Sequence, residues 1–246
     1  MTQITNALFP VIHILSFFGL LLALILLIRK KYKPAGYAFL IALAGLFVNF
    51  ILIIIAAKRL PLYGMFESLT TILCIVGMCL YLSKPFQASP KAIIGYGVMT
   101  LISGFMLFFP LQLNHDFFMY SSPWVQSFFF FRLMAAGIIL FTGIRFTAEL
   151  RSPSTTNNPI LPPKPIYLLF LFGTVLFLCS EFSGSVWCLK GWGDSWHWSE
   201  NFFQSAAIFF LVMLNLHIPI RTFRTQKSRS VLGALSAYTI VFLFLW

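Results

Sequence analysis

The stretch ALFPVIHILSFFGLLLALILLI, which spans Ala7–Ile28, contains no Asp, Glu, Lys or Arg in 22 consecutive positions. A helix needs about 20 such residues to cross the hydrocarbon core of a bilayer, so this stretch predicts a membrane-spanning helix. The rest of the chain has the same character, because 59% of its 246 residues are apolar and only 9% are charged. A soluble domain carries about 25% charged residues. The composition therefore excludes an ordinary soluble domain and a disordered chain.

Seven further apolar runs follow the first, and together the eight runs predict an all-α fold. We expect a polytopic bundle of about eight transmembrane helices that forms a single integral membrane domain over residues 1–246. The runs are continuous and do not alternate, which excludes a β-barrel. No basic region precedes the first run, so we expect a retained helix and not a cleaved signal peptide. The runs cover residues 7–28, 36–56, 64–83, 93–110, 128–145, 166–182, 201–219 and 231–246.

The basic residues are distributed unevenly between alternate loops, which predicts the orientation of the bundle. One side collects thirteen of them: Arg29, Lys30, Lys31, Lys33, Lys84, Lys91, Arg145, Arg151, Lys164, Arg221, Arg224, Lys227 and Arg229. The opposite side has only Lys58, Arg59 and Lys190. Positive loops remain in the cytoplasm, so both termini are expected outside it. Because the bases cluster between apolar runs, the net charge of +11 indicates topology in a lipid bilayer and no nucleic-acid partner.

Four of the six tryptophans fall within twelve residues, at Trp187, Trp192, Trp196 and Trp198. The charge distribution places them in a tryptophan-rich external loop over residues 183–200. An aromatic belt at the membrane interface is the simpler interpretation, although a belt spreads its tryptophans around a bundle. Tryptophans concentrated in one loop with glycines favour stacking on a large, flat, apolar ligand at the bilayer surface.

This segment resembles the signature of the CcsA-type (ResC-like) cytochrome c assembly proteins, the tryptophan-rich haem-handling subunits of the two-component cytochrome c synthase. The signature has the form W-x-x-x-x-W-G-x-x-W-x-W-D, and a helix that ends in a histidine before a basic loop follows it. The pattern is matched by Trp187, Trp192, Gly193, Trp196 and Trp198. His217 follows Ser199 by 18 residues, as the family's membrane histidine follows its aspartate.

Two other stretches support the resemblance, which extends from about residue 60 to residue 220. Pro61-Leu-Tyr-Gly-Met-Phe-Glu-Ser-Leu69 is similar to the family's P-L-x-x-x-Y-E-S-L, and Pro123-Trp-Val-Gln-Ser127 is similar to its P-x-L-Q-S. The chain departs from the family at Ser199, where the signature ends in aspartate, although Glu200 follows directly. The family's two external histidines, its usual axial haem ligands, have no counterparts in these 246 residues.

Histidine supplies the candidate metal ligands, because neutral imidazole is a standard axial ligand for haem iron. His217 lies deep in a predicted membrane helix, where an ionisable residue is commonly functional. With the resemblance we expect it to bind metal; without the resemblance, a hydrogen-bonded histidine or one at the headgroup boundary is the simpler interpretation. His115 and His197 are the local candidates for an outer ligand, although ordinary solvated loop positions explain both. His13, in the first helix, is expected to pack.

Arg132 falls inside an apolar run, about one turn from the expected start of its helix. Two interpretations are equally good. The side chain either extends to the membrane interface or binds a haem propionate through a bidentate guanidinium–carboxylate pair. Glu67 and Glu181 lie at the outer ends of their predicted helices, and we expect them to pair with Arg132, Lys58 or Arg59.

The resemblance implies a haem-handling and haem-transport subunit of cytochrome c biogenesis, and possible membership of a synthase that attaches haem. Haem b in transit would enter near His217, and the tryptophan segment would present it at the outer face to an apocytochrome c. The family works with a ResB-type membrane subunit, and the bacterial inner membrane is the expected location. Two alternatives stay open: a membrane regulator or chaperone of haem synthesis with the same signature, and a small-molecule transporter unrelated to haem.

Overall fold

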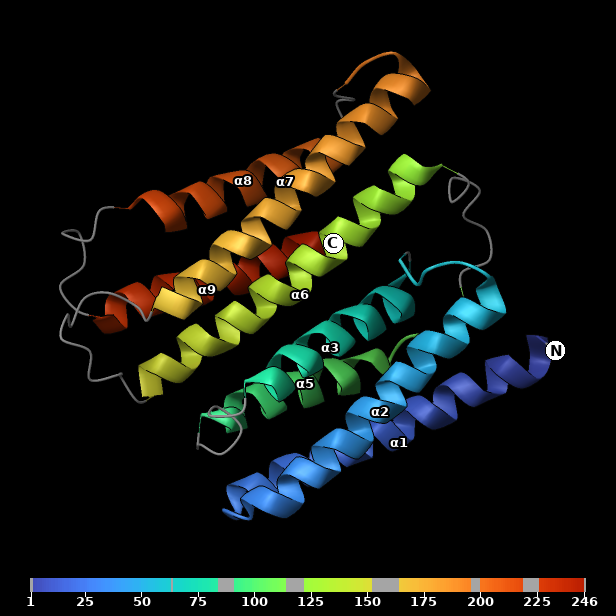
Figure 1. Ribbon diagram of the computed structural model, residues 1–246, viewed down its shortest axis with the longest axis vertical. Coiled ribbons are helices and arrows are strands. Elements are labelled where there is room, and N and C mark those ends of the chain that lie inside the picture. The colour runs from blue at the N-terminus through green and yellow to red at the C-terminus, as the bar shows by residue number, and fades with distance from the viewer. Residues whose placement is uncertain are drawn as a thin grey trace. The chain divides into compact units, whose positions relative to one another are not determined.

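The computed structural model describes residues 2–62, 64–83, 91–113, 122–151, 164–195, 200–218 and 226–245. In these ranges all regular secondary structure is helical (Figure 1), which confirms the predicted all-α fold. The helices are α1 (Thr2–Ile28), α2 (Tyr32–Ala57), α3 (Met65–Leu82), α5 (Ala92–Met106), α6 (Pro123–Arg151), α7 (Lys164–Trp192), α8 (Glu200–His217) and α9 (Gln226–Leu245).

Six of the described helices, α1, α2, α3, α6, α7 and α9, are long and apolar enough to cross a membrane. The apolar parts of α5 and α8, Ala92–Met106 and Phe202–His217, are shorter. At 1.5 Å per residue, the 15 residues of α5 extend about 22 Å, which is less than the roughly 30 Å of a hydrocarbon core. The helices fit a multi-pass membrane protein. The count of about eight spans and the external position of both termini stay predictions.

The chain divides into two compact units, Met1–Phe118 and Met119–Trp246. The first unit contains α1, α2, α3 and α5, and the second contains α6, α7, α8 and α9. Each unit is built from helices that follow one another in the chain, as short connections between antiparallel neighbours favour. A single domain over residues 1–246 stays a prediction.

In the first unit, α1 and α2 form an antiparallel hairpin (Figure 1). Their backbones approach closely at Gly19, where an added Cβ would lie 2.9 Å from the Cβ of Ala42. Lipid tails are as apolar as leucine, so helices in a membrane gain by fitting small residues together and not by hiding apolar ones. His13, on the same helix, is fully buried, and its Nε2 lies 3.0 Å from the Ser103 carbonyl of α5. The expectation that His13 packs is confirmed.

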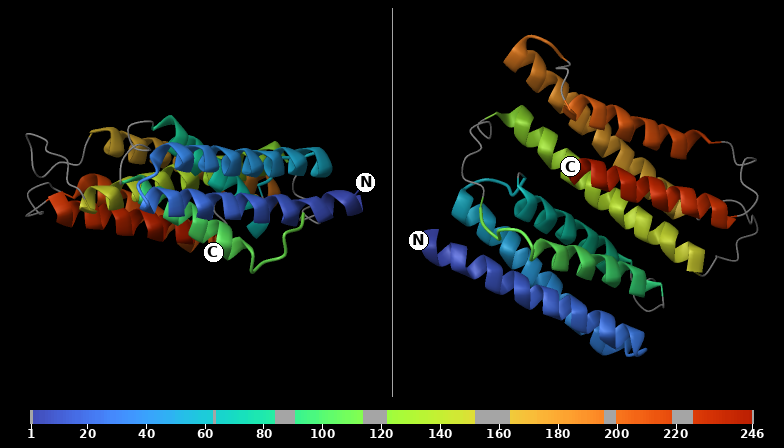
Figure 2. Two further views of the ribbon diagram at one scale, coloured as in Figure 1. Left: turned by 90° about the horizontal axis from the view of Figure 1, so that it is seen from below. Right: turned by 180° about the vertical axis from the view of Figure 1, so that it is seen from behind.

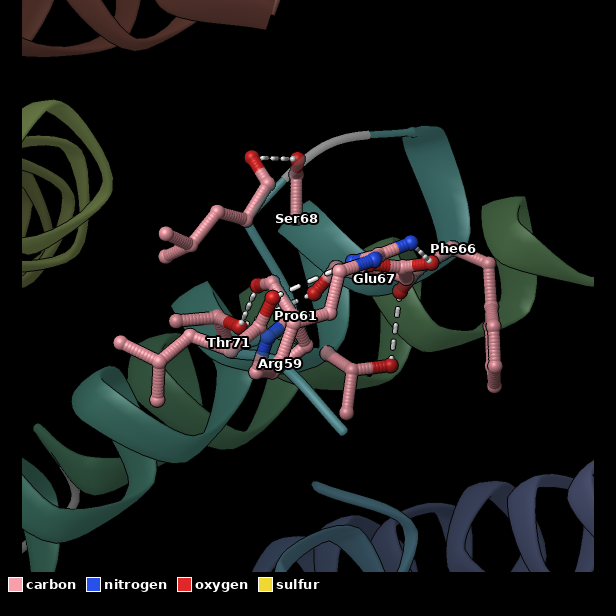
Figure 3. Close-up of polar contacts among 9 residues, drawn as sticks. Arg59, Pro61, Phe66, Glu67, Ser68 and Thr71 are labelled. Atoms are coloured by element: carbon pink, nitrogen blue, oxygen red, sulfur yellow. Dashed lines mark hydrogen bonds and ion pairs between the residues drawn. The ribbon is translucent and has the colours of Figure 1, made fainter. Parts of the chain in front are cut away.

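The connection from α2 to α3 is held by an ion pair between Arg59 and Glu67 (Figure 3). Arg59 Nη1 lies 2.6 Å from one carboxylate oxygen of Glu67, and Nη2 lies 2.9 Å from the other. The Glu67 side chain is only 1% exposed. From within α3, the Thr71 hydroxyl donates to the Pro61 carbonyl of this connection at 2.8 Å. The predicted pairing of Glu67 with a neighbouring base is therefore confirmed, and it is bidentate.

In the second unit α6 packs on both α7 and α9, and α8 packs mainly on α9 (Figure 2). The contact of α6 with α9 is made through glycines on both helices. An added Cβ at Gly143 would lie 3.0 Å from the Cβ of Ala237, and one at Gly233 would lie 2.8 Å from the ring of Phe146. These two contacts define an antiparallel register, in which residues near the end of α6 lie level with residues near the start of α9.

Helix α7 continues into the segment for which the sequence predicts a loop. Residues 183–192 are helical, 193–195 are not, and α8 begins at Glu200. The helix ends at Gly193, whose φ of +74° is a left-handed conformation that favours glycine. The Gly193 N–H still donates to the Leu189 carbonyl at 3.1 Å. The predicted loop over 183–200 starts too early because a helix ends where its backbone hydrogen bonding stops, not where its side chains become less apolar.

Glu67→Gln should destabilise the first unit, because it leaves the Arg59 guanidinium without its buried counterion. We expect the free energy of unfolding in detergent to fall by about 3 kcal/mol, as measured by denaturant unfolding of the full chain. Lys58→Gln is the matched control, because it removes an exposed cation one residue away. An equal loss of stability in both variants would show that the ion pair has no specific role.

Candidate functional site

A buried ion pair connects three helices of the second unit. Arg132 of α6 is 6% exposed, and its Nη1 lies 3.4 Å from Oε1 of Glu181 on α7. The hydroxyl of Ser205, on α8, donates to the same carboxylate oxygen at 2.9 Å. The predicted pairing of Glu181 with Arg132 is confirmed. Because charge inside a membrane helix is costly unless it is paired, this group of three residues is a candidate functional site.

The surroundings of Arg132 exclude the interpretation that its side chain extends to the interface. Helix α6 begins at Pro123, five residues before the predicted run. Arg132 therefore lies nine residues, or about 13 Å, inside the helix and not one turn from its start. Its guanidinium carbon is 5.2 Å from the ring centroid of Phe128 and 5.2 Å from that of Phe244 on α9. The flat cation is thus held between aromatic rings and a carboxylate.

This arrangement also limits the propionate clamp predicted for Arg132. One guanidinium nitrogen, Nη1, already faces Glu181, and Arg132 as a whole is only 6% exposed. Glu181 in turn accepts a second hydrogen bond from Ser205. The geometry supports an internal ion pair directly, and the propionate clamp stays a prediction.

An aromatic cluster lies next to the ion pair and shares Phe128 with it. The ring centroid of Phe128 is 6.2 Å from that of Trp187, which in turn is 5.5 Å from Trp192. The Lys190 ammonium lies 5.2 Å from the ring centroid of Trp124, at the start of α6. Trp187 is half-buried, whereas Trp192 is 49% exposed. Two of the four predicted tryptophans therefore come together, on a helix and not on a loop, with one indole accessible.

The remaining residues predicted for this region lie partly outside the described ranges. Gly193 is described and ends α7. Trp196, Trp198 and His197 lie outside the described residues, and so does His115.

His217 is the last residue of α8 and is exposed at its end. Its Nδ1 lies 3.1 Å from the carbonyl of Met213, one turn earlier. A carbonyl can only accept, so Nδ1 is the donor, and in the neutral form of the ring Nε2 keeps its lone pair. Metal-bound histidines are commonly oriented by this kind of backbone hydrogen bond. His217 and the aromatic cluster lie at opposite ends of the second unit, because α8 begins near the end of α7 and extends back for 18 residues, or about 27 Å, to His217 (Figure 1).

Helix α8 presents an exposed apolar stripe that ends at His217. Phe203, Ala207, Phe210 and His217 recur at helical spacing, and Phe203 and Phe210 are 66% and 65% exposed. The opposite, buried side of the helix carries Ser205, Ile208 and Val212. In the described part of the chain no three His, Cys, Asp or Glu side chains gather as a metal site.

The sequence interpretation did not include Ser205 or Trp124 in the site. Ser205 is 6% exposed and starts the buried stripe of α8, so helical spacing could have placed it on a packed face. Its carboxylate partner could not be found in this way, because Ser205 and Glu181 are on different helices. Trp124 lies within the segment that resembles the family, but its contact with Lys190 depends on how α6 and α7 pack.

Comparison with known proteins returned no significant match to a protein-family model, a curated protein or a solved structure. The resemblance to CcsA-type proteins therefore rests on the sequence segments quoted above, and the assignment is a proposal.

Arg132→Met should destabilise the second unit, because Glu181 loses its counterion while it stays largely buried. We expect a loss of about 3 kcal/mol in the free energy of unfolding, together with a change in tryptophan fluorescence as Phe128 moves against Trp187. The double variant Arg132→Met with Glu181→Gln should regain much of the loss, because no uncompensated charge remains. Additive losses in this double-mutant cycle would contradict a coupled pair.

Proposed function

We propose that the protein handles haem in the membrane for cytochrome c assembly. In this proposal the end of α8 holds haem through His217, and the aromatic cluster at the end of α7 presents it for covalent attachment to an apocytochrome c. Two separate features support the proposal: the tryptophan-rich segment that resembles CcsA-type proteins, and the geometry of His217.

The observation that carries the proposal is the hydrogen bond from Nδ1 of His217 to the Met213 carbonyl, at 3.1 Å. It leaves Nε2 as the ligating atom, on a side chain that other residues do not cover. A histidine that only packs in a membrane core would be enclosed, as His13 is. His217 instead combines the tautomer and the exposure that an axial haem ligand needs.

The exposed face of α8 would suit an apolar ligand such as a porphyrin. A porphyrin is flat and mostly apolar and supplies four nitrogen ligands to its iron, so one or two axial protein ligands suffice. Phe210, which is 65% exposed, lies seven residues or about 10 Å from His217 on the same side of the helix, and Ala207 and Phe203 continue that face toward the start of α8. Bound haem would supply the reactive chemistry, and the protein would supply the axial nitrogen, the apolar surface and the position.

The aromatic cluster would serve the other end of the path. Trp192 is half-exposed and stands against Trp187, which the Arg132–Glu181 pair supports through Phe128. Indole rings held in this way can stack on a flat apolar ligand with little loss of side-chain freedom. Transfer to an apocytochrome would place the edge of the porphyrin ring within reach of the cysteine thiols of the apocytochrome.

The proposal includes partners and a location. By the resemblance, a ResB-type membrane subunit and an apocytochrome c would act with this chain. By the same resemblance, the bacterial inner membrane would be the site of action. The thirteen basic residues on one side predict that both termini lie outside the cytoplasm.

The optical spectrum of the purified full chain tests haem binding directly. Protein purified in detergent from haem-replete cells should show a Soret band. His217→Gly should weaken this band, and added imidazole should restore it by occupying the vacated axial position. Imidazole rescue separates a lost ligand from a lost fold, because free imidazole would not repair a misfolded bundle.

His13→Phe is the matched control, since it removes a buried imidazole from the first unit and should leave the Soret band unchanged. A colourless wild-type protein would contradict the proposal and would favour a transporter unrelated to haem. If His13→Phe abolished the Soret band and His217→Gly left it unchanged, haem would bind in the first unit, and the role proposed for His217 would be wrong.

Covalent attachment distinguishes a synthase subunit from a regulator of haem synthesis. Co-expression with a ResB-type subunit and an apocytochrome reporter should produce covalent haem on the reporter. Trp192→Ala should lower the yield without weakening the His217-dependent Soret band, because it acts at the other end of the path. A reporter without haem beside a chain that binds haem would favour the regulator.

A further inference from the structure

The turn between α1 and α2 carries a dense group of exposed cations. Four of the five residues from 29 to 33 are basic, and we call them the basic turn: Arg29, Lys30, Lys31 and Lys33. All four side chains are exposed, and none forms an ion pair with a described residue. Adjacent like charges repel one another. The end of α1 favours cations and the start of α2 disfavours them, so the helix dipoles do not explain the group.

Lys30 has a backbone conformation in which glycine is more usual. Its φ of +59° is left-handed. The Lys30 N–H donates to the Leu27 carbonyl at 3.0 Å. The next N–H, that of Lys31, donates to the Leu26 carbonyl at 2.9 Å. These two bonds form a Schellman motif, whose left-handed position is commonly a glycine. A lysine at this position strains the backbone, and strained positions are often functional.

The described residues of the first unit hold no acid close enough to neutralise the basic turn. Their one acidic residue is Glu67, which is paired with Arg59 at the other end of α2. Helix α2 is 26 residues, or about 39 Å, long, whereas salt screens exposed charges beyond about 8 Å. The first turn of α2 also contains no acidic residue. A bound counter-charge therefore has to come from outside this unit.

The basic turn follows directly after an apolar segment of membrane length. This segment of α1, Leu8–Ile28, has 21 residues and extends about 31 Å, close to the roughly 30 Å of a hydrocarbon core. Ile28 is 60% exposed and Tyr32 is 37% exposed, on either side of the first three cations. Tyrosine is enriched where a bilayer meets water. In a membrane crossed by α1, the basic turn lies at the level of the lipid phosphates.

We propose that the basic turn binds the phosphate groups of anionic phospholipids. Charge complementarity carries the proposal, because basic segments directly beside a membrane helix attract anionic lipids. The lysines act as point charges on flexible stems, which suits several headgroups in variable positions. Ile28 and Tyr32 offer the same lipids an apolar surface below the phosphates. None of these residues belongs to the haem proposal, so the two proposals are independent.

Native mass spectrometry of the full chain in detergent tests the basic turn. The protein is titrated with phosphatidylglycerol or with zwitterionic phosphatidylcholine at low ionic strength, and bound lipid is counted. Wild type should prefer phosphatidylglycerol. Lys30→Gly and Lys33→Gln should each weaken phosphatidylglycerol binding by about fivefold, the effect of one cation at a membrane surface. Neither variant should change the binding of phosphatidylcholine.

Lys58→Gly is the matched control for Lys30→Gly. Lys58 is an exposed lysine with a left-handed φ of +53°, at the opposite end of α2. Each variant removes one cation and one strained position, so each should raise the midpoint of denaturant unfolding. Lost lipid binding in Lys30→Gly would then not be a loss of folding. An equal loss of phosphatidylglycerol binding in both variants would overturn the proposal, because net charge alone would explain it.

Competitors separate the lipid from other anionic occupants. A phosphatidylglycerol preference that persists in excess inorganic phosphate supports the lipid. Loss of bound phosphatidylglycerol with phosphate retained on the protein overturns the lipid and assigns the basic turn to the free anion. Equal binding of both lipids by wild type, together with tight binding of polyglutamate, also overturns the lipid and favours an acidic protein segment.

Discussion

A carboxylate or guanidinium can stay inside these apolar helices only against an opposite charge, and this constraint organises each unit. Arg59 and Glu67 join the end of α2 to the start of α3, and Arg132 and Glu181 join α6 to α7. Apolar packing alone discriminates poorly between helix rotations, since lipid covers an unpacked leucine as well as protein does. The two opposite charges of a buried ion pair must meet each other. The pair therefore selects the rotation of each helix about its own axis that brings the two side chains together.

The consequences of the second pair extend to the surface of its unit. Glu181 also accepts from Ser205, which brings α8 into the same contact, and Arg132 is covered by Phe128 and Phe244. Phe128 then contacts Trp187. The aromatic cluster thus rests on a polar centre that four helices share. A tryptophan that only marked the membrane interface would need no such support.

The second unit carries different chemistry at its two ends. One end presents an indole beside a supported aromatic cluster, and the other presents an imidazole whose Nε2 is left to bind. The proposed handling of haem would make use of both ends.

The sequence by itself determined the all-helical fold with long apolar helices, because apolar length is a local property of the chain. It also predicted that Glu67 and Glu181 pair with Arg132, Lys58 or Arg59, and the structure selected Arg59 for Glu67 and Arg132 for Glu181. It also singled out Trp187, Trp192 and His217 as candidates. The end of α7 at Gly193, the burial of Arg132 and the shared contact of Glu181 with Ser205 were decided only by the tertiary structure. The physical reason is the same in each case. Where a helix stops depends on its backbone hydrogen bonds, and which side chains meet depends on helix rotation, and neither quantity is encoded in the apolar pattern of a single segment.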